Sequence, residues 1–229
     1  MHFSLNDEQL MLQKMMRAFA DEVVAPGAIE RDKTKAFPIE IFNQLAEMGI
    51  MGLPFPEQYG GAGADTISFV IATEELSRVC ASTGITYSAH ISLGGAPLHL
   101  FGTEQQKEKY LTPICTGESF GAFGLTEPNA GSDAGGTETQ AVLKDGQFTI
   151  NGSKVFITNA SYAKHLALTA ITNVKDGKKE ISAIIVPTDA AGFTIKSEYE
   201  KMGLNASNTT ELILEDVVVP EENLLGVRG

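Results

Sequence analysis

The sequence predicts an α+β protein in two parts: an all-helical domain over residues 1–117, followed by an all-β, barrel-like domain over residues 118–229. In the first part, apolar residues recur at helical spacing between capping residues. In the second, short β-branched runs alternate with tight-turn dipeptides. With 43% hydrophobic and 20% charged residues, the 229-residue chain has the composition of a globular protein that buries a sizeable core.

The first two helices are predicted from their ends. Asn6 is a good N-cap with Gln9 three residues later, which is the capping-box spacing, and Pro26 ends the apolar pattern that follows. Pro38 suits the first turn of a second helix, and Gly49 suits the position just after its last turn.

Three more helices follow. Asp65 is expected to cap the third, a fourth covers residues 84 to about 93, and Thr103 with Gln106 forms a second capping box before a helix that ends by Gly117. The apolar residues assigned to the third helix are Ile67, Val70, Ile71 and Val79.

The second half carries hairpin signals. Asp145-Gly146, Asn151-Gly152 and Asp176-Gly177 are dipeptides typical of two-residue turns between antiparallel strands. The strand-length runs around them are residues 147–150, 153–158, 181–186, 192–195 and 211–219.

Composition excludes several classes of function. The net charge of −12 and the lack of a Lys/Arg-rich run argue against nucleic-acid binding, which needs clustered cations. No apolar run approaches the roughly 18 residues of a membrane span.

Asp7 and Glu8 stand where a signal peptide would carry cations, and Cys80 and Cys115 are expected to be buried free thiols. We therefore expect a cytoplasmic protein, or a mitochondrial-matrix one if a transit peptide has been removed. The histidines show no metal-ligand spacing, so no metal is expected.

The most unusual stretch is residues 123–136. A strand carrying an aromatic and a hydroxyl residue runs into a loop of Pro, Asn, Gly and Ser, which can present several backbone N–H groups in one concavity. Such a nest binds a phosphate or pyrophosphate without positive side chains. From the residues alone, an ordinary surface loop remains the simpler explanation.

Two segments resemble a known family. Residues 125–133 are similar to the first signature of the acyl-CoA dehydrogenases, and residues 151–159 resemble the flavin-side strand of that family. The resemblance continues through residues 59–61, 101–107 and 201–212, so it covers the whole chain. It is strongest to the short-chain, butyryl-CoA type.

The resemblance implies FAD as the cofactor. Phe123, Leu125 and Thr126 would contact it from the first strand of the second domain, with Thr126 at the pyrimidine side of the flavin. Phe156 and Thr158 would lie against the flavin ring, with the Thr158 hydroxyl near N5.

Two further residues are implied for phosphates or substrate. Ser132 would serve the flavin phosphates or the pantetheine of CoA, and Thr172 is a weaker candidate for the CoA diphosphate. Each hydroxyl could instead be an ordinary, satisfied strand or loop residue. The chain departs from the common pattern at Phe156, where many members have Trp, and at Ala160, where Gly is common.

The implied activity is the FAD-dependent α,β-dehydrogenation of a short-chain acyl-CoA to the trans-2-enoyl-CoA, as in fatty-acid β-oxidation. Electrons would pass to an electron-transferring flavoprotein, and the full-length form would be a homotetramer. A non-catalytic flavin or acyl-CoA binding module is the alternative. A relative that oxygenates or reduces its substrate is a third possibility.

Family members continue into a helical C-terminal domain that carries the glutamate base. This chain ends at Gly229, so the resemblance implies that the C-terminal helical bundle is absent and that none of these residues is catalytic. We therefore expect the chain alone to bind FAD weakly and to be inactive.

Overall fold

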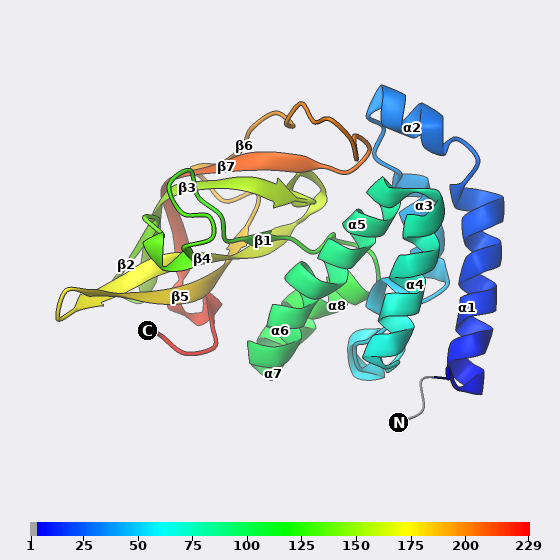
Figure 1. Ribbon diagram of the computed structural model, residues 1–229. Helices are drawn as coiled ribbons and strands as arrows, with labels where there is room; N and C mark the ends of the chain where they lie inside the picture. Colours follow the sequence, from blue (N-terminus) through cyan, green and yellow to red (C-terminus); the bar gives the residue numbers. More distant parts are fainter. Residues whose placement is uncertain (1–3) are drawn as a thin grey trace.

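The computed structural model describes residues 4–229 and places the helices first and the sheet second (Figure 1). Short π-helical turns extend α1 over Ala20–Val24, join α5 to α6 over His90–Gly95 and join α7 to α8 over Lys107–Leu111. The α-helices are α1 (Asp7–Phe19), α2 (Ala28–Thr34), α3 (Ile39–Glu47), α4 (Thr66–Val79), α5 (Ala81–Ala89), α6 (Ala96–Phe101), α7 (Glu104–Gln106) and α8 (Thr112–Cys115).

The strands form one mixed, eight-stranded sheet in the order β6-β7-β3-β2-β4-β5-β8, with β1 added in parallel to β4. The predicted order of a helical part and then a sheet is thus confirmed. The strands are β1 (Phe123–Gly124), β2 (Gln140–Lys144), β3 (Gln147–Thr158), β4 (His165–Lys175), β5 (Lys178–Pro187), β6 (Phe193–Ile195), β7 (Thr209–Pro220) and β8 (Leu224–Leu225).

Both predicted capping boxes are confirmed. The side chain of Asn6 accepts from the Gln9 backbone N–H at 2.8 Å, and the Gln9 side chain accepts in return from the Asn6 N–H at 3.0 Å. Thr103 and Gln106 make the same reciprocal pair. Each box satisfies two N–H groups that a helix start leaves without partners inside the helix.

The third helix is confirmed: the Asp65 side chain accepts from the Ser68 N–H at 2.8 Å, and the assigned apolar residues lie on α4, with Ile67 and Val70 half exposed at 51% and 53%. The helical prediction was wrong in two places. The fourth helix begins at Ala81 and continues through a π turn into α6, so residues 84–93 are only part of it. Helix α2 was missed because no residue in it is buried, so it has no apolar stripe.

Polar contacts attach α2 to the segment between β6 and β7, which runs beside it in Figure 1. The Lys35 ammonium lies 2.6 Å from a Glu200 carboxylate oxygen. The Asp32 carboxylate accepts from the backbone N–H of Asn205 at 2.8 Å. An ion pair and hydrogen bonds therefore connect α2 and the residue that follows it with residues 196–208.

One of the three hairpin predictions was wrong. Asp145-Gly146 and Asp176-Gly177 do connect strands, and all four residues have the positive φ that such turns require. Asn151-Gly152, in contrast, lies inside β3, where the pairing with β7 shifts register. A Cβ on Gly152 would lie 2.8 Å from the Cα of Thr139, so this glycine allows a close backbone approach.

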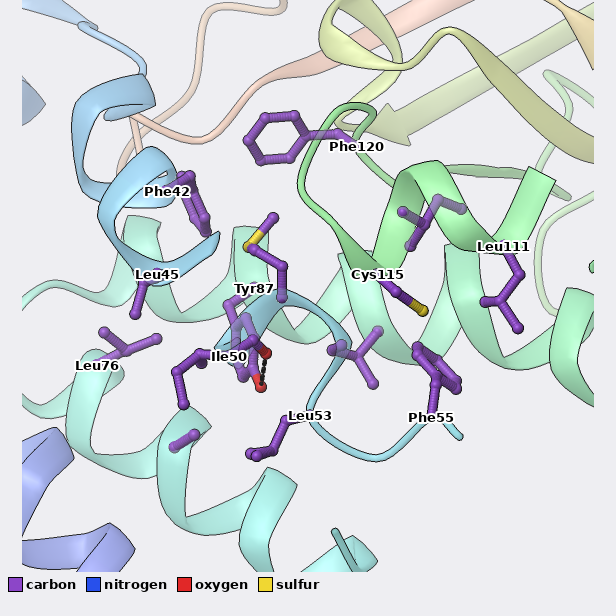
Figure 2. Packing of buried hydrophobic residues seen from close by; sticks show 14 of the residues in the cluster. Phe42, Leu45, Ile50, Leu53, Phe55, Leu76, Tyr87, Leu111, Cys115 and Phe120 are labelled. Carbon is purple, nitrogen blue, oxygen red and sulfur yellow. Dashed lines mark hydrogen bonds between the residues drawn. The ribbon is translucent and has the colours of Figure 1, made fainter. Parts of the chain in front are cut away.

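The buried apolar residues form two clusters, one centred in the helices and one in the sheet. Figure 2 shows the first, in which the hydroxyl of the fully buried Tyr87 donates to the Ile50 carbonyl at 3.0 Å. Burial raises the pKa of Tyr87. The first cluster also includes Ala167, Ile185 and Leu225 from the sheet, so the helices pack directly against the sheet.

Cys80 and Cys115 are both buried free thiols, as predicted. Burial raises the pKa of Cys115 to about 12, which keeps it protonated. Over the part of the chain that the structure describes, no helix combines the length and the apolar character that crossing a membrane requires.

Candidate functional site

The segment that follows β1 runs along β3. The backbone N–H of Val155 donates to the Thr126 carbonyl at 2.8 Å, and the Lys154 ammonium lies 3.3 Å from the Leu125 carbonyl. Leu125 and Thr126 were predicted to lie on the first strand of the second domain. The strand β1 ends at Gly124, so both residues lie just after it. Leu125 is 40% exposed and Thr126 is half-buried, so both remain accessible beside β3.

Phe156 occupies an unusual position in β3. The pairing of β3 with β7 shifts register between Lys154 and Ile157, and within this bulge Phe156 has a φ of 60°. A bulky residue rarely adopts that left-handed conformation, and β-bulges redirect side chains next to functional sites. The Phe156 side chain is 63% exposed, and its ring centroid lies 5.1 Å from that of Tyr199. The bulge therefore presents an aromatic face to solvent.

The end of β3 is anchored to the helical part. Thr158 is half-buried and pairs with Thr209 on β7. The next residue, Asn159, is fully buried, and its side-chain amide donates to the carbonyls of Thr86 on α5 and Gly121 before β1 at 3.1 and 3.2 Å. Phe156 and Thr158 therefore lie where the sheet meets the helices.

The loop between β1 and β2 is built around Glu127, which is 4% exposed. Its carboxylate accepts from the backbone N–H groups of Glu138 and Thr139 and from the Thr137 hydroxyl. It also lies 2.6 Å from the fully buried ammonium of Lys154. Burial alone would raise the pKa of Glu127, but hydrogen bonds led by that from Lys154 outweigh it and lower the pKa to about 2.

The tip of this loop offers free hydrogen-bond donors. Glu127 and Ala130 exchange two backbone hydrogen bonds of 3.0 and 3.1 Å, which close the first turn. Beyond them, no acceptor within residues 4–229 takes a hydrogen bond from the N–H groups of residues 131–135. Ser132 is exposed, and a Cβ on Gly131 would meet nothing within 4 Å. The N–H groups of residues 131–135 are therefore available to an acceptor on a ligand.

Phe123 lies at the start of this region. It is half-buried on β1, opposite Ala167 of β4, and it packs against the helical core cluster. Leu125 and Thr126 follow it in the chain, and Thr126 accepts a hydrogen bond from Val155, the residue before Phe156.

Thr172 lies apart from these residues. It is 5% exposed on β4, and its hydroxyl is 2.7 Å from the Ser182 hydroxyl and 3.3 Å from the Glu180 carbonyl. With its hydroxyl engaged by β5, Thr172 keeps little capacity for a ligand. Its assignment to CoA stays a prediction.

Two family models cover most of the chain. The acyl-CoA dehydrogenase N-terminal domain matches residues 6–118, and the acyl-CoA dehydrogenase middle domain matches residues 122–217. The chain belongs to the acyl-CoA dehydrogenase family.

Curated members of this family are similar over the whole chain. A probable acyl-CoA dehydrogenase YngJ of Bacillus subtilis is 54% identical over 99% of this chain. A short-chain-specific acyl-CoA dehydrogenase of Clostridium acetobutylicum is 48% identical over 100% of it. The chain spans 60% of the length of each of these relatives.

Solved structures share the fold. Butyryl-CoA dehydrogenase from Megasphaera elsdenii matches with a TM-score of 0.95 and 43% identity, over 100% of this chain and 61% of that one. A chain in a structure of the electron transferring flavoprotein of Acidaminococcus fermentans, described with flavin-based electron bifurcation, matches with a TM-score of 0.95 and 46% identity, over 100% of this chain and 60% of that one. An acyl-CoA dehydrogenase from Bacillus anthracis, complexed with FAD, matches with a TM-score of 0.90 and 38% identity, over 99% of this chain and 38% of that one.

Sequence reasoning missed two of the residues that hold this candidate site together. Glu127 and Lys154 lie within the two segments that resemble the family signatures, but no role was assigned to them. The signal was present in part, because Lys154 is the single charged residue in the predicted strand over residues 153–158. The sequence does not show which carboxylate would pair with this cation, because the pairing is made by tertiary contacts.

Proposed function

We propose that this chain binds FAD and a short-chain acyl-CoA and forms part of a short-chain acyl-CoA dehydrogenase, which converts the acyl-CoA to the trans-2-enoyl-CoA. The observation that carries the proposal is the exposed, left-handed Phe156, which lies next to the Leu125–Thr126 backbone and a loop with free N–H donors. Relatives named as short-chain specific and as butyryl-CoA dehydrogenase support the substrate class.

The residues present fit FAD. Phe123, Leu125 and Phe156 offer apolar and aromatic surface for a flat ring system, and the hydroxyls of Thr126 and Thr158 offer hydrogen bonds to its polar edge. Ser132 and the free N–H groups of residues 131–135 would hold the diphosphate, since oriented donors bind an anion without clustered cations. When bound, FAD supplies the hydride acceptor for the substrate β-hydrogen.

A base is also required, to remove the α-proton of the substrate. Glu127 directly follows Thr126, but its pKa of about 2 and its ion pair with Lys154 make it a poor proton acceptor near neutral pH. We therefore do not assign the base to Glu127, and in line with the family resemblance we propose that the base comes from outside residues 4–229.

Two partners belong to the same proposal. An electron-transferring flavoprotein is the proposed electron acceptor, supported by the match to a chain in a structure of such a flavoprotein. Self-association into a homotetramer is proposed for the whole protein. Exposed apolar side chains on α6, such as Leu100 and Phe101 at 68% and 63%, provide surface for such contacts.

The test is an anaerobic titration of the FAD-reconstituted chain with butyryl-CoA, monitored by the absorbance of oxidised flavin. We expect FAD to bind and its absorbance to remain when butyryl-CoA is added. Bleaching would show that a base is present and would overturn that part of the proposal. Failure of the chain to take up FAD at concentrations that saturate a known flavoprotein would overturn the proposal as a whole.

A further inference from the structure

Besides each other, Glu127 and Lys154 bind backbone groups of the loop between β1 and β2, which a purely stabilising ion pair does not need to do. We propose that this pair positions the ligand-facing backbone of residues 125–139, and that both residues are positioning residues for the flavin site. The inference rests on the proposed function for its ligand, and its geometric part is testable without FAD.

Lys154 connects three segments. Its ammonium lies 2.6 Å from a Glu127 carboxylate oxygen, 3.3 Å from the Leu125 carbonyl and 3.1 Å from the Thr169 hydroxyl on β4. Its stem also passes close to Gly124, where a Cβ would lie 3.3 Å from Lys154 Cγ. One side chain thus fixes the segment after β1 in relation to both β3 and β4.

Glu127 fixes both ends of the loop. It lies near the start of the loop, and its carboxylate accepts from the Thr137 hydroxyl and from the N–H groups of Glu138 and Thr139 at the end. Between these ends, the loop has the Glu127–Ala130 bridge and a turn over Ala134–Gly136. Asn129 also donates to the Glu138 carboxylate at 3.2 Å, and the Lys179 ammonium lies 2.8 Å from the Thr137 carbonyl. Among these contacts, the Glu127 carboxylate is the one that joins the two ends of the loop from a buried position.

Stability alone does not explain this choice of residues. A buried ion pair loses hydration on both sides, and apolar residues of similar volume are often as stable or more so in its place. An apolar pair, however, could not hold the Leu125 carbonyl and the N–H groups of residues 138 and 139, because these contacts are directional hydrogen bonds. We attribute the retained charge to the placement of this backbone.

The experiment compares four forms of the 229-residue chain. Lys154→Met with Glu127→Leu removes the pair and leaves no unpaired charge. Lys154→Met with Glu127→Gln also removes the charge but keeps an amide oxygen that can accept from Thr139. Glu75→Leu is the control, because Glu75 is also buried at 1% and ion-paired but joins α1 to α4. The wild type is the reference.

Two readouts separate positioning from folding. Amide hydrogen exchange of residues 138, 139 and 155 in the FAD-free chain reports the loop and its contact with β3, and fluorescence titration with FAD reports ligand affinity. We expect Lys154→Met/Glu127→Leu to lose exchange protection at these amides and at least tenfold in FAD affinity. Lys154→Met/Glu127→Gln should recover part of the exchange protection and part of the FAD affinity. Glu75→Leu should lower the melting temperature without changing either readout.

Wild-type exchange protection at residues 138 and 139 in Lys154→Met/Glu127→Leu would overturn the inference. So would an FAD affinity unchanged from that of the wild type. If Lys154→Met/Glu127→Leu does not fold, the Glu127→Gln form decides on the same two readouts against the Glu75→Leu control. If the wild type itself binds no FAD, the proposed function fails, and the exchange data still decide whether the pair places the loop.

Discussion

Glu75 in the helical part and Glu127 beside the sheet are both buried carboxylates with cationic partners, but the surroundings of those partners differ. Glu75 pairs with Arg17 and Arg78, whose side chains are 55% and 41% exposed. Glu127 pairs with Lys154, which is fully buried. The arginines keep most of their hydration, so water can replace a lost contact there. Water does not reach Lys154, so it cannot replace a lost contact with Glu127. The stability of the sheet therefore depends on its ion pair much more than the stability of the helices depends on theirs.

The largest predicted effect is on the sheet pair. Lys154→Met leaves the Glu127 carboxylate buried without a counter-charge, and we expect a loss of about 3–5 kcal/mol in the free energy of unfolding. Urea unfolding measures this, and adding Glu127→Leu should restore most of the loss. A single variant as stable as the wild type would show that water reaches Glu127 and would remove the contrast with Glu75.

A second effect arises where the two parts meet. His90 is fully buried; its Nδ1 accepts from the Gly121 N–H at 2.9 Å, and its Nε2 lies 3.0 Å from the Met51 carbonyl. Burial lowers the pKa of His90 to about 4. His165 is also buried, and its Nε2 lies 2.9 Å from the Tyr110 carbonyl. Burial lowers the pKa of His165 to about 4 as well.

Since both folded pKa values lie below the unfolded value of about 6.5, the unfolded chain binds more protons between these pH values. Stability is therefore full above about pH 6.5 and falls as the pH drops toward 4, by about 3 kcal/mol for each histidine. Thermal melts from pH 7 to 4 test this. The slope should become shallower in His90→Gln; an unchanged slope would show that other groups cause the acid sensitivity.

A smaller effect is expected in the helices. Arg17→Met removes two hydrogen bonds to Glu75, but Arg78 still holds that carboxylate at 3.1 Å. We predict a loss of stability less than about half of that for Lys154→Met, and a smaller one at high salt, because exposed ions are screened. Equal losses in the two variants would contradict the comparison.

The smallest change should be a gain. Replacing Phe156 by glycine relieves a left-handed φ of 60°, which costs a bulky residue roughly 1–2 kcal/mol. The ring is 63% exposed, so little apolar burial is lost. We expect Phe156→Gly to be up to about 1 kcal/mol more stable without FAD and to bind FAD more weakly. A loss of stability would mean that the contact with Tyr199 outweighs the strain.

The features that could be predicted from the sequence are local. The capping boxes at Asn6 and Thr103 and the turn at Asp145-Gly146 each depend on residues within four positions of one another, and all are confirmed. Asn151-Gly152 looks the same locally, but there the Asn151 side chain exchanges two hydrogen bonds with Asp216 on β7. A partner 65 residues away therefore decides the conformation.

The candidate site divides in the same way. Phe123, Leu125, Thr126, Ser132, Phe156 and Thr158 were assigned by resemblance, and their roles stay predictions. The structure adds what holds them: the bulge at Phe156, the Asn159 anchor and the Lys154–Glu127 pair. These three depend on tertiary pairing and burial, so no local pattern displays them.

The contacts between α2 and residues 196–208 make the surroundings of Phe156 depend on ionic strength. That segment carries Tyr199, the aromatic neighbour of Phe156, and it is attached to α2 through Lys35–Glu200 and Asp32–Asn205. The Lys35–Glu200 pair is exposed. At an ionic strength near 1 M the Debye length shrinks to about 3 Å, so this contact weakens, whereas the buried Lys154–Glu127 pair is screened much less. Added salt therefore weakens the attachment of the segment that carries Tyr199 and leaves the Lys154–Glu127 pair in place.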